Sequence, residues 1–186
     1  MNKNILKNIP NFLTTFRIVI IPILIMSFYI EGMVAHFIAA ALFAIAAITD
    51  YFDGYFARAL KVQSNFGRCL DPIADKLLVI VAIVMLINFS ERSLWILIPG
   101  LIIICREVLV SGLREFLAEL RVSVPVSKLA KYKTAVQMVA ITGLLLGIKL
   151  SLVLLMVFLA KALFCLAAIL TVITGYAYFR VGMKNM

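Results

Sequence analysis

Long apolar runs alternate with short polar segments along the whole chain. A helix needs about 20 consecutive apolar residues to cross a bilayer, and six runs approach or exceed that length. These runs lie at residues 12–30, 34–60, 72–89, 93–114, 129–148 and 151–179. The pattern therefore predicts an all-α integral membrane protein, with six transmembrane helices in a single domain over residues 1–186.

The composition agrees with a membrane setting. Hydrophobic residues make up 65% of the chain and its mean hydropathy is +1.12, whereas soluble domains are roughly half apolar. The segments 34–60 and 93–120 are longer than one crossing. We therefore expect their ends, which carry charged residues, to project into the aqueous interface.

Basic residues are concentrated in alternate connections between the runs. The formal net charge is +9, and Lys and Arg gather before residue 18, at 58–68, at 114–133 and near the C-terminus. Cytoplasmic connections are enriched in Lys and Arg, so both termini and the 58–68 connection are predicted to be cytoplasmic. Nucleic-acid binding is not predicted, because the chain lacks an extended basic patch with interleaved aromatic residues.

Four aspartates stand beside the second and third apolar runs. Asp50 and Asp53 are three residues apart and Asp71 and Asp75 are four apart, so each pair shares one face of a helix. The short connection between the runs contains turn-forming residues, and Pro72 is expected in the first turn of the third helix. The two helices then run antiparallel, and the four carboxylates converge near the cytoplasmic surface.

Carboxylates at membrane depth must be paired, metal-bound or in contact with water. Four adjacent carboxylates repel one another unless a cation lies among them or some of them are protonated. Oxygen donors without His or Cys favour Mg²⁺ or Mn²⁺ over zinc, and two such ions suit phosphoryl chemistry. The alternative is a salt-bridge network with Arg58, Arg68 and Lys76. That network does not account for Gly54 and Ala57, whose small side chains leave the helix face open to a polar ligand.

The four aspartates belong to a longer pattern, D-x2-D-G-x2-A-R-x8-G-x3-D-x3-D. Its eight positions are Asp50, Asp53, Gly54, Ala57, Arg58, Gly67, Asp71 and Asp75. The pattern resembles the signature of the CDP-alcohol phosphatidyltransferases. The resemblance implies six transmembrane helices, usually a homodimer, two divalent ions held by the four aspartates, and CDP-diacylglycerol as the lipid donor. The non-acidic positions of the signature are expected at the donor.

Three further stretches narrow the resemblance. Residues 8–18, 106–118 and 128–141 look like members of this family that join CDP-diacylglycerol to sn-glycerol 3-phosphate, giving phosphatidylglycerophosphate and CMP. This implies a multi-pass protein of the bacterial inner membrane, in contact with the lipid bilayer and with its active site on the cytoplasmic side. Donor contacts from the first helix are then expected from Asn11, Thr14 and Arg17.

A second group of cations suits a phosphorylated acceptor. Arg106 lies inside an apolar run, and Arg114 follows two turns later on roughly the same face. With Lys131, Lys133 and Thr134 they could enclose a small phosphate. The alternative is that the arginines pair with neighbouring acids, namely Glu107, Glu115 or Glu119.

The resemblance assigns Asp75 the role of general base toward the 1-hydroxyl of the acceptor, and Arg58 a role in stabilising the departing CMP. Other acceptors remain alternatives: phosphatidylglycerol, as in cardiolipin synthesis, serine, or inositol phosphate. A cation transporter is the alternative from another class, but transport predicts carboxylates spread through the bilayer, and Glu31 and Glu91 lie in external turns. A helical scaffold subunit would leave the eight signature positions unexplained.

Overall fold

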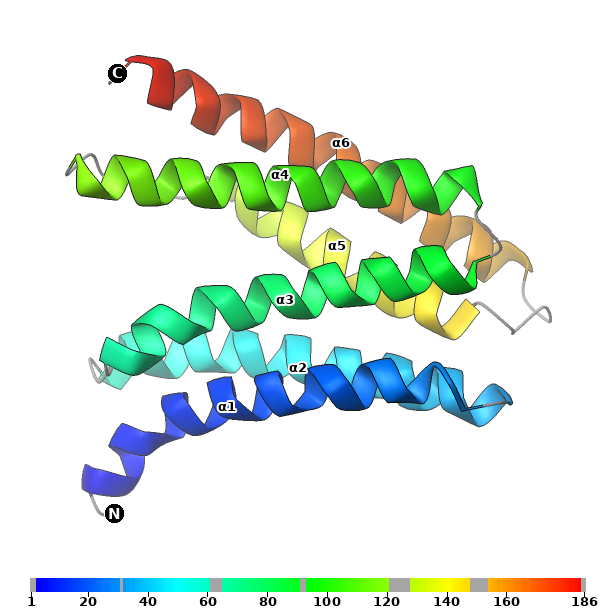
Figure 1. Cartoon of the computed structure of the whole chain (residues 1–186), viewed down its shortest axis with the longest axis horizontal. Coiled ribbons are helices and arrows are strands. Elements are labelled where there is room, and N and C mark those ends of the chain that lie inside the picture. The colour runs from blue at the N-terminus through cyan, green and yellow to red at the C-terminus, as the bar shows by residue number, and fades with distance from the viewer. Residues whose placement is uncertain are drawn as a thin grey trace. The chain divides into compact units, whose positions relative to one another are not determined.

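The computed structural model describes residues 3–30, 32–60, 65–90, 93–120, 128–147 and 154–184. For residues 3–12, 33, 51–60, 65–69, 128, 154 and 184 it describes the backbone alone. Six helices lie in these ranges (Figure 1): α1 (Lys3–Ser27), α2 (Met33–Leu60), α3 (Asn65–Phe89), α4 (Leu94–Glu119), α5 (Lys128–Gly147) and α6 (Leu154–Lys184). The described ranges contain no strand.

The all-helical prediction is confirmed, and each predicted run coincides with one helix over most of its length. The differences lie at the ends. The helix α1 begins at Lys3 rather than residue 12, and α6 continues to Lys184 rather than 179. Hydropathy marks only the apolar part of a helix, whereas the hydrogen-bonded backbone continues through polar residues that tolerate helical geometry.

The prediction for the start of α3 is wrong. It places Pro72 in the first turn, but α3 begins at Asn65, so Pro72 lies inside the helix. A proline there removes one backbone hydrogen bond to the residue four positions earlier. The segment 65–71 contains one glycine and no proline, so it can extend the helix although it is too polar to register in a hydropathy pattern.

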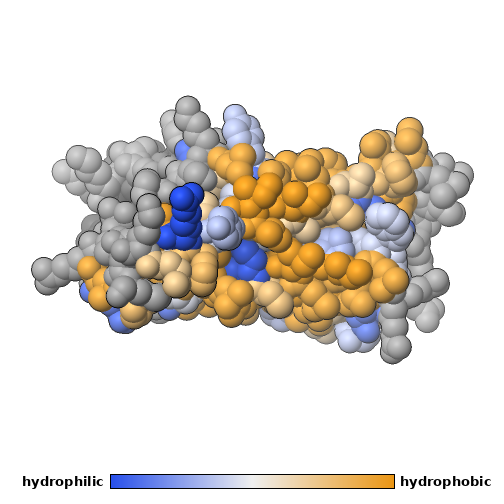
Figure 2. All heavy atoms as spheres, turned by 90° about the horizontal axis from the view of Figure 1, so that it is seen from above, coloured by the Kyte–Doolittle hydropathy of each residue, from blue (hydrophilic) through white to orange (hydrophobic). Residues whose placement is uncertain are grey.

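Two helices in the described part of the chain are long and apolar enough to cross a membrane. They are Leu94–Glu119 and the Leu155–Met183 segment of α6, and shorter apolar stretches occur at Leu13–Ser27 and Val34–Asp50. Many of their exposed side chains are large and apolar, such as Leu109 and Phe158, and Figure 2 shows hydrophobic residues over most of the described surface on one face. This surface suits lipid contact, and six crossings stay a prediction.

Residues 1–85 and 86–186 form two compact units. In the first unit α1 packs along α2 (Figure 1), and its core includes the fully buried Leu24, Phe43 and Leu78. Gly32 stands immediately before α2 with φ +110°, a left-handed conformation that glycine adopts without the steric cost of a side chain. The prediction of a single domain stays a prediction.

In the second unit α6 packs against both α4 and α5 (Figure 1). Small residues allow these helices to approach closely. A Cβ on Gly147 of α5 would lie 2.9 Å from Val157 Cγ2, and a Cβ on Gly175 of α6 would lie 3.1 Å from Arg106 Cγ. The contact at Gly175 brings Arg106 against the polar residues of α6.

Candidate active site

Arg17 of α1 lies between two of the predicted aspartates. Its Nη1 donates to Asp50 Oδ1 at 2.5 Å, and its Nη2 lies 3.8 Å from Asp71 Oδ1. The Arg17 side chain is 1% exposed, whereas those of Asp50 and Asp71 are 34% and 25% exposed. A buried guanidinium is tolerated only when it is paired. Its charge therefore ties α1 to α2 and α3, while the carboxylates keep an accessible side.

Thr14 gives Asp71 a second partner from the same helix. It stands three residues before Arg17, so the two side chains share one face of α1. The buried Thr14 Oγ1 donates to Asp71 Oδ1, the same oxygen that Arg17 approaches. The sequence prediction placed Thr14 and Arg17 beside the donor substrate; in the structure both contact the carboxylates and fix the orientation of Asp71.

Asp75 lies one turn further along α3 than Asp71, on the same face and half-buried. It is flanked by Ala74 and followed by Leu78, which are both fully buried. The remaining residues predicted for this site have side chains outside the described residues. They are Asn11 in α1, Asp53, Gly54, Ala57 and Arg58 in α2, and Gly67 in α3.

Whether these residues fit a metal ion depends on their donor atoms. The described donors are carboxylate and hydroxyl oxygens, which suit hard cations such as Mg²⁺ or Mn²⁺. Among the described side chains, no group of three or more His, Cys, Asp or Glu residues could hold a metal. The side chain of Asp53 lies outside the described residues. The carboxylate oxygens of Asp50 and Asp71, which both contact Arg17, nevertheless have the donor chemistry that such a cation requires.

Glu107 joins two of the cations predicted for the acceptor. Its Oε1 accepts a hydrogen bond from Arg106 Nη1 at 3.2 Å and another from Lys133 Nζ. The side chains are 13% exposed for Arg106, 16% for Glu107 and 5% for Lys133. The neighbouring-acid alternative is therefore observed for Arg106, but the same carboxylate also draws Lys133 of α5 to Arg106 of α4.

Arg106 is fixed from α6 as well. Its Nη2 donates to Thr174 Oγ1 at 3.0 Å, and its Cζ lies 5.9 Å from the centre of the Tyr178 ring, within reach of a cation–π contact. Arg106 also packs against Gly175. Sequence reasoning did not identify Thr174 or Tyr178. Their only signal was the presence of polar groups in a strongly apolar helix.

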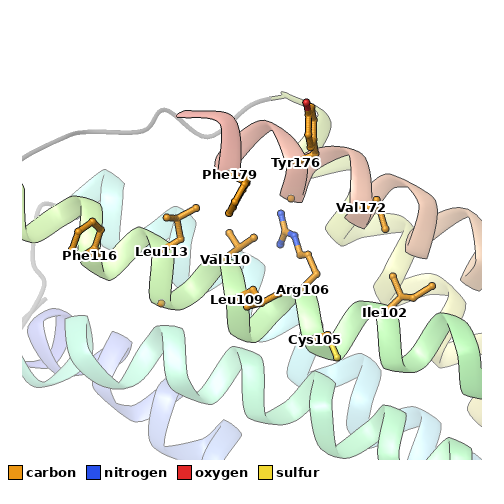
Figure 3. A pocket seen from close by; sticks show the side chains of 12 residues that line it. Ile102, Cys105, Arg106, Leu109, Val110, Leu113, Phe116, Val172, Tyr176 and Phe179 are labelled. Carbon is orange, nitrogen blue, oxygen red and sulfur yellow. The ribbon is translucent and has the colours of Figure 1, made fainter. Parts of the chain in front are cut away.

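A groove of about 710 Å³ lies between α4 and α6 beside this cluster. Figure 3 shows Arg106 extending from α4 toward α6, among the apolar side chains of the groove. Of the residues that line it, Arg106 alone is charged; the others include Leu109, Leu113, Val172 and Phe179. The groove offers a hydrocarbon-like surface and no carboxylate, so it is unsuited to metal binding.

The other residues predicted for the acceptor lie apart from this buried cluster. Arg114, Lys131 and Thr134 are exposed, and Thr134 Oγ1 donates to the backbone oxygen of Ala130 at 3.1 Å. None of the ion pairs in the described part of the chain involves Arg114 or Lys131. The structure thus brings Arg106 and Lys133 together and leaves these three residues at the surface.

Comparison with known proteins shows similarity over nearly the whole chain. The sequence profile of the CDP-alcohol phosphatidyltransferase family matches residues 7–174. A CDP-diacylglycerol–glycerol-3-phosphate 3-phosphatidyltransferase of Rickettsia felis is 49% identical over 181 residues, covering 96% of this chain and 97% of the relative. The protein of the same name from Rickettsia bellii is 50% identical over 178 residues, with the same coverage. That of Haemophilus influenzae is 45% identical over 140 residues, covering 74% of this chain and 75% of the relative.

Proposed function

Because the chain belongs to the CDP-alcohol phosphatidyltransferase family, we propose that it transfers the phosphatidyl group of CDP-diacylglycerol to the 1-hydroxyl of sn-glycerol 3-phosphate. The products are phosphatidylglycerophosphate and CMP. The observation that carries this proposal is 49% to 50% identity, over 96% of the chain, to relatives named as CDP-diacylglycerol–glycerol-3-phosphate 3-phosphatidyltransferases. The chain is accordingly a transferase of phospholipid biosynthesis.

The metal site consists of Asp50, Asp53, Asp71 and Asp75. Members of the family generally depend on divalent metal ions, and these four residues would hold two, Mg²⁺ or Mn²⁺. Bound ions would polarise the diphosphate of the donor and offset the charge that develops on departing CMP. Arg17 and Thr14 hold Asp71 from α1, and Arg17 holds Asp50 as well. These contacts keep the two carboxylates in the orientation that metal binding requires.

Asp75 acts on the acceptor as a general base. It takes the proton of the 1-hydroxyl, and the resulting oxygen bonds to the phosphorus that carries diacylglycerol. The bond from that phosphorus to the CMP oxygen breaks, and Arg58 stabilises the negative charge of the departing group. The donor is bordered by Asn11, Thr14, Arg17, Gly54, Ala57 and Gly67.

The acceptor's phosphate is bound by cations of the second unit. Arg106 and Lys133 form the centre of this subsite, supported by their burial and their shared contact with Glu107. A phosphate accepts strong, charge-assisted hydrogen bonds from such groups. Arg114, Lys131 and Thr134 are exposed, and they contribute at its edge.

The proposed setting is the bacterial inner membrane. The apolar surfaces of α4 and α6 support membrane insertion, and the basic connections support cytoplasmic termini and a cytoplasmic active site. The chain crosses this membrane six times and forms a homodimer, as expected from the resemblance to the family.

Acceptor choice is the most accessible test of this function. Purified protein with CDP-diacylglycerol is offered labelled glycerol 3-phosphate, glycerol, serine, inositol phosphate or phosphatidylglycerol in separate reactions, and the lipid product is identified. Glycerol 3-phosphate should react, and glycerol should be a very poor acceptor, because each hydrogen bond to a charged phosphate contributes about 1.5–3 kcal/mol. Equal or faster reaction with one of the other acceptors would refute the assignment of glycerol 3-phosphate.

A further inference from the structure

The carboxylate of Glu107 is shared by two buried cations on different helices. One oxygen, Oε1, accepts from Arg106 Nη1 on its own helix α4 and from Lys133 Nζ on α5. All three side chains are at most 16% exposed. The three groups carry one negative and two positive charges, so one positive charge remains for a ligand.

We propose that Glu107 is a positioning residue of the acceptor subsite, which holds Arg106 and Lys133 together so that both can bind one phosphate. This inference rests on the proposed function. Glu107 touches the two cations and acts on the substrate only through them.

Electrostatics explains why the two cations need this carboxylate. Two like charges held close together in a poorly solvated site repel each other, and removing the carboxylate that they share removes a compensating negative charge. Arg106 is also held by Thr174 and Tyr178, whereas Lys133 reaches Glu107 with a long, flexible side chain. Without Glu107, the flexible Lys133 side chain is therefore the group expected to leave.

Both cations keep hydrogens that can reach a phosphate. Each terminal nitrogen of a guanidinium carries two hydrogens, and an ammonium carries three. Arg106 uses Nη1 for Glu107 and Nη2 for Thr174, which leaves a second hydrogen on each nitrogen. The contact with Glu107 thus fixes the cations without consuming their capacity to donate.

Buried polar groups near Arg106, Glu107 and Lys133 indicate that a polar molecule can bind beside these three residues. Gln137 follows Lys133 by one turn on α5 and is 2% exposed, while Thr171 precedes Thr174 by one turn on α6 and is 0% exposed. Within the described part of the chain, Gln137 Oε1 and Thr171 Oγ1 have no hydrogen-bond partner. Buried polar atoms are normally satisfied, so these groups favour a polar occupant, either water or a hydroxylated ligand.

The test compares Glu107→Gln with wild type in the full-length protein. Glutamine keeps the size of the side chain and removes its charge. The KM for glycerol 3-phosphate should rise about tenfold or more, as expected when a charged hydrogen bond to the phosphate is lost. The KM for CDP-diacylglycerol should stay unchanged. Glycerol 3-phosphate should also protect the variant less against thermal unfolding, which gives a readout that is independent of turnover.

Two further variants complete the comparison. Glu115→Gln removes an exposed carboxylate from the same helix and should behave like wild type. Glu107→Asp keeps the charge on a side chain one carbon shorter, so its KM for glycerol 3-phosphate should lie between those of wild type and Glu107→Gln. If Glu107→Gln does not fold, the test rests on Glu107→Asp. An unchanged KM of Glu107→Asp for glycerol 3-phosphate then overturns the proposal.

The outcomes separate this inference from the proposed function. A lower KM for glycerol 3-phosphate in Glu107→Gln would show that Glu107 competes with the phosphate, which overturns the positioning role. A lower thermal stability with both KM values unchanged would show a purely structural ion pair and would overturn it too. If wild type itself does not use glycerol 3-phosphate, the proposed function fails, whatever the variants do.

Discussion

Asp71→Asn should lower the rate of phosphatidyl transfer about 1,000-fold, because a metal ion stabilises such a transition state by several kcal/mol and each 1.4 kcal/mol is tenfold in rate. Asp71 accepts a hydrogen bond from Thr14 and lies beside Arg17, which also binds Asp50. Asparagine keeps the shape but removes the charge that a divalent cation needs. The rate of CMP release by the purified variant, at saturating substrates and over a range of Mg²⁺ and Mn²⁺ concentrations, measures the effect.

A matched control for this variant is Glu115→Gln, which removes a carboxylate from an exposed position and should leave the rate unchanged. Excess chelator should abolish turnover of wild type, and added Mg²⁺ or Mn²⁺ should restore it. Full turnover in excess chelator would contradict a catalytic role for metal ions. Full turnover of Asp71→Asn would remove Asp71 from the site.

Asp75→Asn should lower kcat by about 100-fold to 10,000-fold, the range that a general base contributes. Asp75 lies one turn beyond Asp71 on α3, and its proposed role at the metal site includes removal of the acceptor proton. Binding of CDP-diacylglycerol should therefore be largely preserved, because a base contributes to the chemical step more than to the ground state. Steady-state kinetics and a separate donor-binding measurement test both parts.

The Asp75 variant also distinguishes a base from a binding residue. An increase in KM for CDP-diacylglycerol with kcat preserved would assign Asp75 to donor binding instead. A kcat that falls equally for Asp75→Asn and Asp75→Glu would show that position matters as much as charge. A kcat that recovers in Asp75→Glu would support the proton-transfer role.

The fold could be predicted from hydropathy because each helix has a long apolar segment. The ends of the helices could not be predicted in this way. The backbone of α3, for example, extends to Asn65 through residues that are too polar to appear in a hydropathy pattern. The same limit applies to α1, which begins at Lys3. Hydropathy reports where a helix meets an apolar medium, whereas helix ends depend on backbone hydrogen bonds and the following turn.

In the first unit, residue spacing predicted which helix faces carry the carboxylates but not which side chains contact them. The spacing of the aspartates predicted that α2 and α3 bring carboxylates together, and Arg17 contacts both Asp50 and Asp71. The contact partners of Arg17 could not be predicted, because they stand 33 residues or more away in the sequence. Such contacts depend on how helices pack, which spacing within one helix does not determine.

The acceptor residues illustrate a second limit. Arg114 follows Arg106 by eight residues, which at 3.6 residues per turn leaves their directions about 80° apart. In the structure Arg106 is largely buried and Arg114 is exposed. A rotation of this size separates a side chain in a helix interface from one outside it. Arg106 and Lys133, which the sequence prediction grouped, both pair with Glu107, a carboxylate that the prediction considered only as an alternative partner of Arg106.

The transfer of the phosphatidyl group to the acceptor's 1-hydroxyl is tested most directly with an isotope. Glycerol 3-phosphate carrying ¹⁸O in its 1-hydroxyl is incubated with CDP-diacylglycerol and the purified protein, and both products are examined by mass spectrometry. Attack by the acceptor oxygen on the phosphorus that bears diacylglycerol predicts ¹⁸O in the phosphatidylglycerophosphate and none in CMP. Appearance of ¹⁸O in CMP, or release of CMP with unlabelled phosphatidic acid as the lipid product, would contradict the proposed reaction.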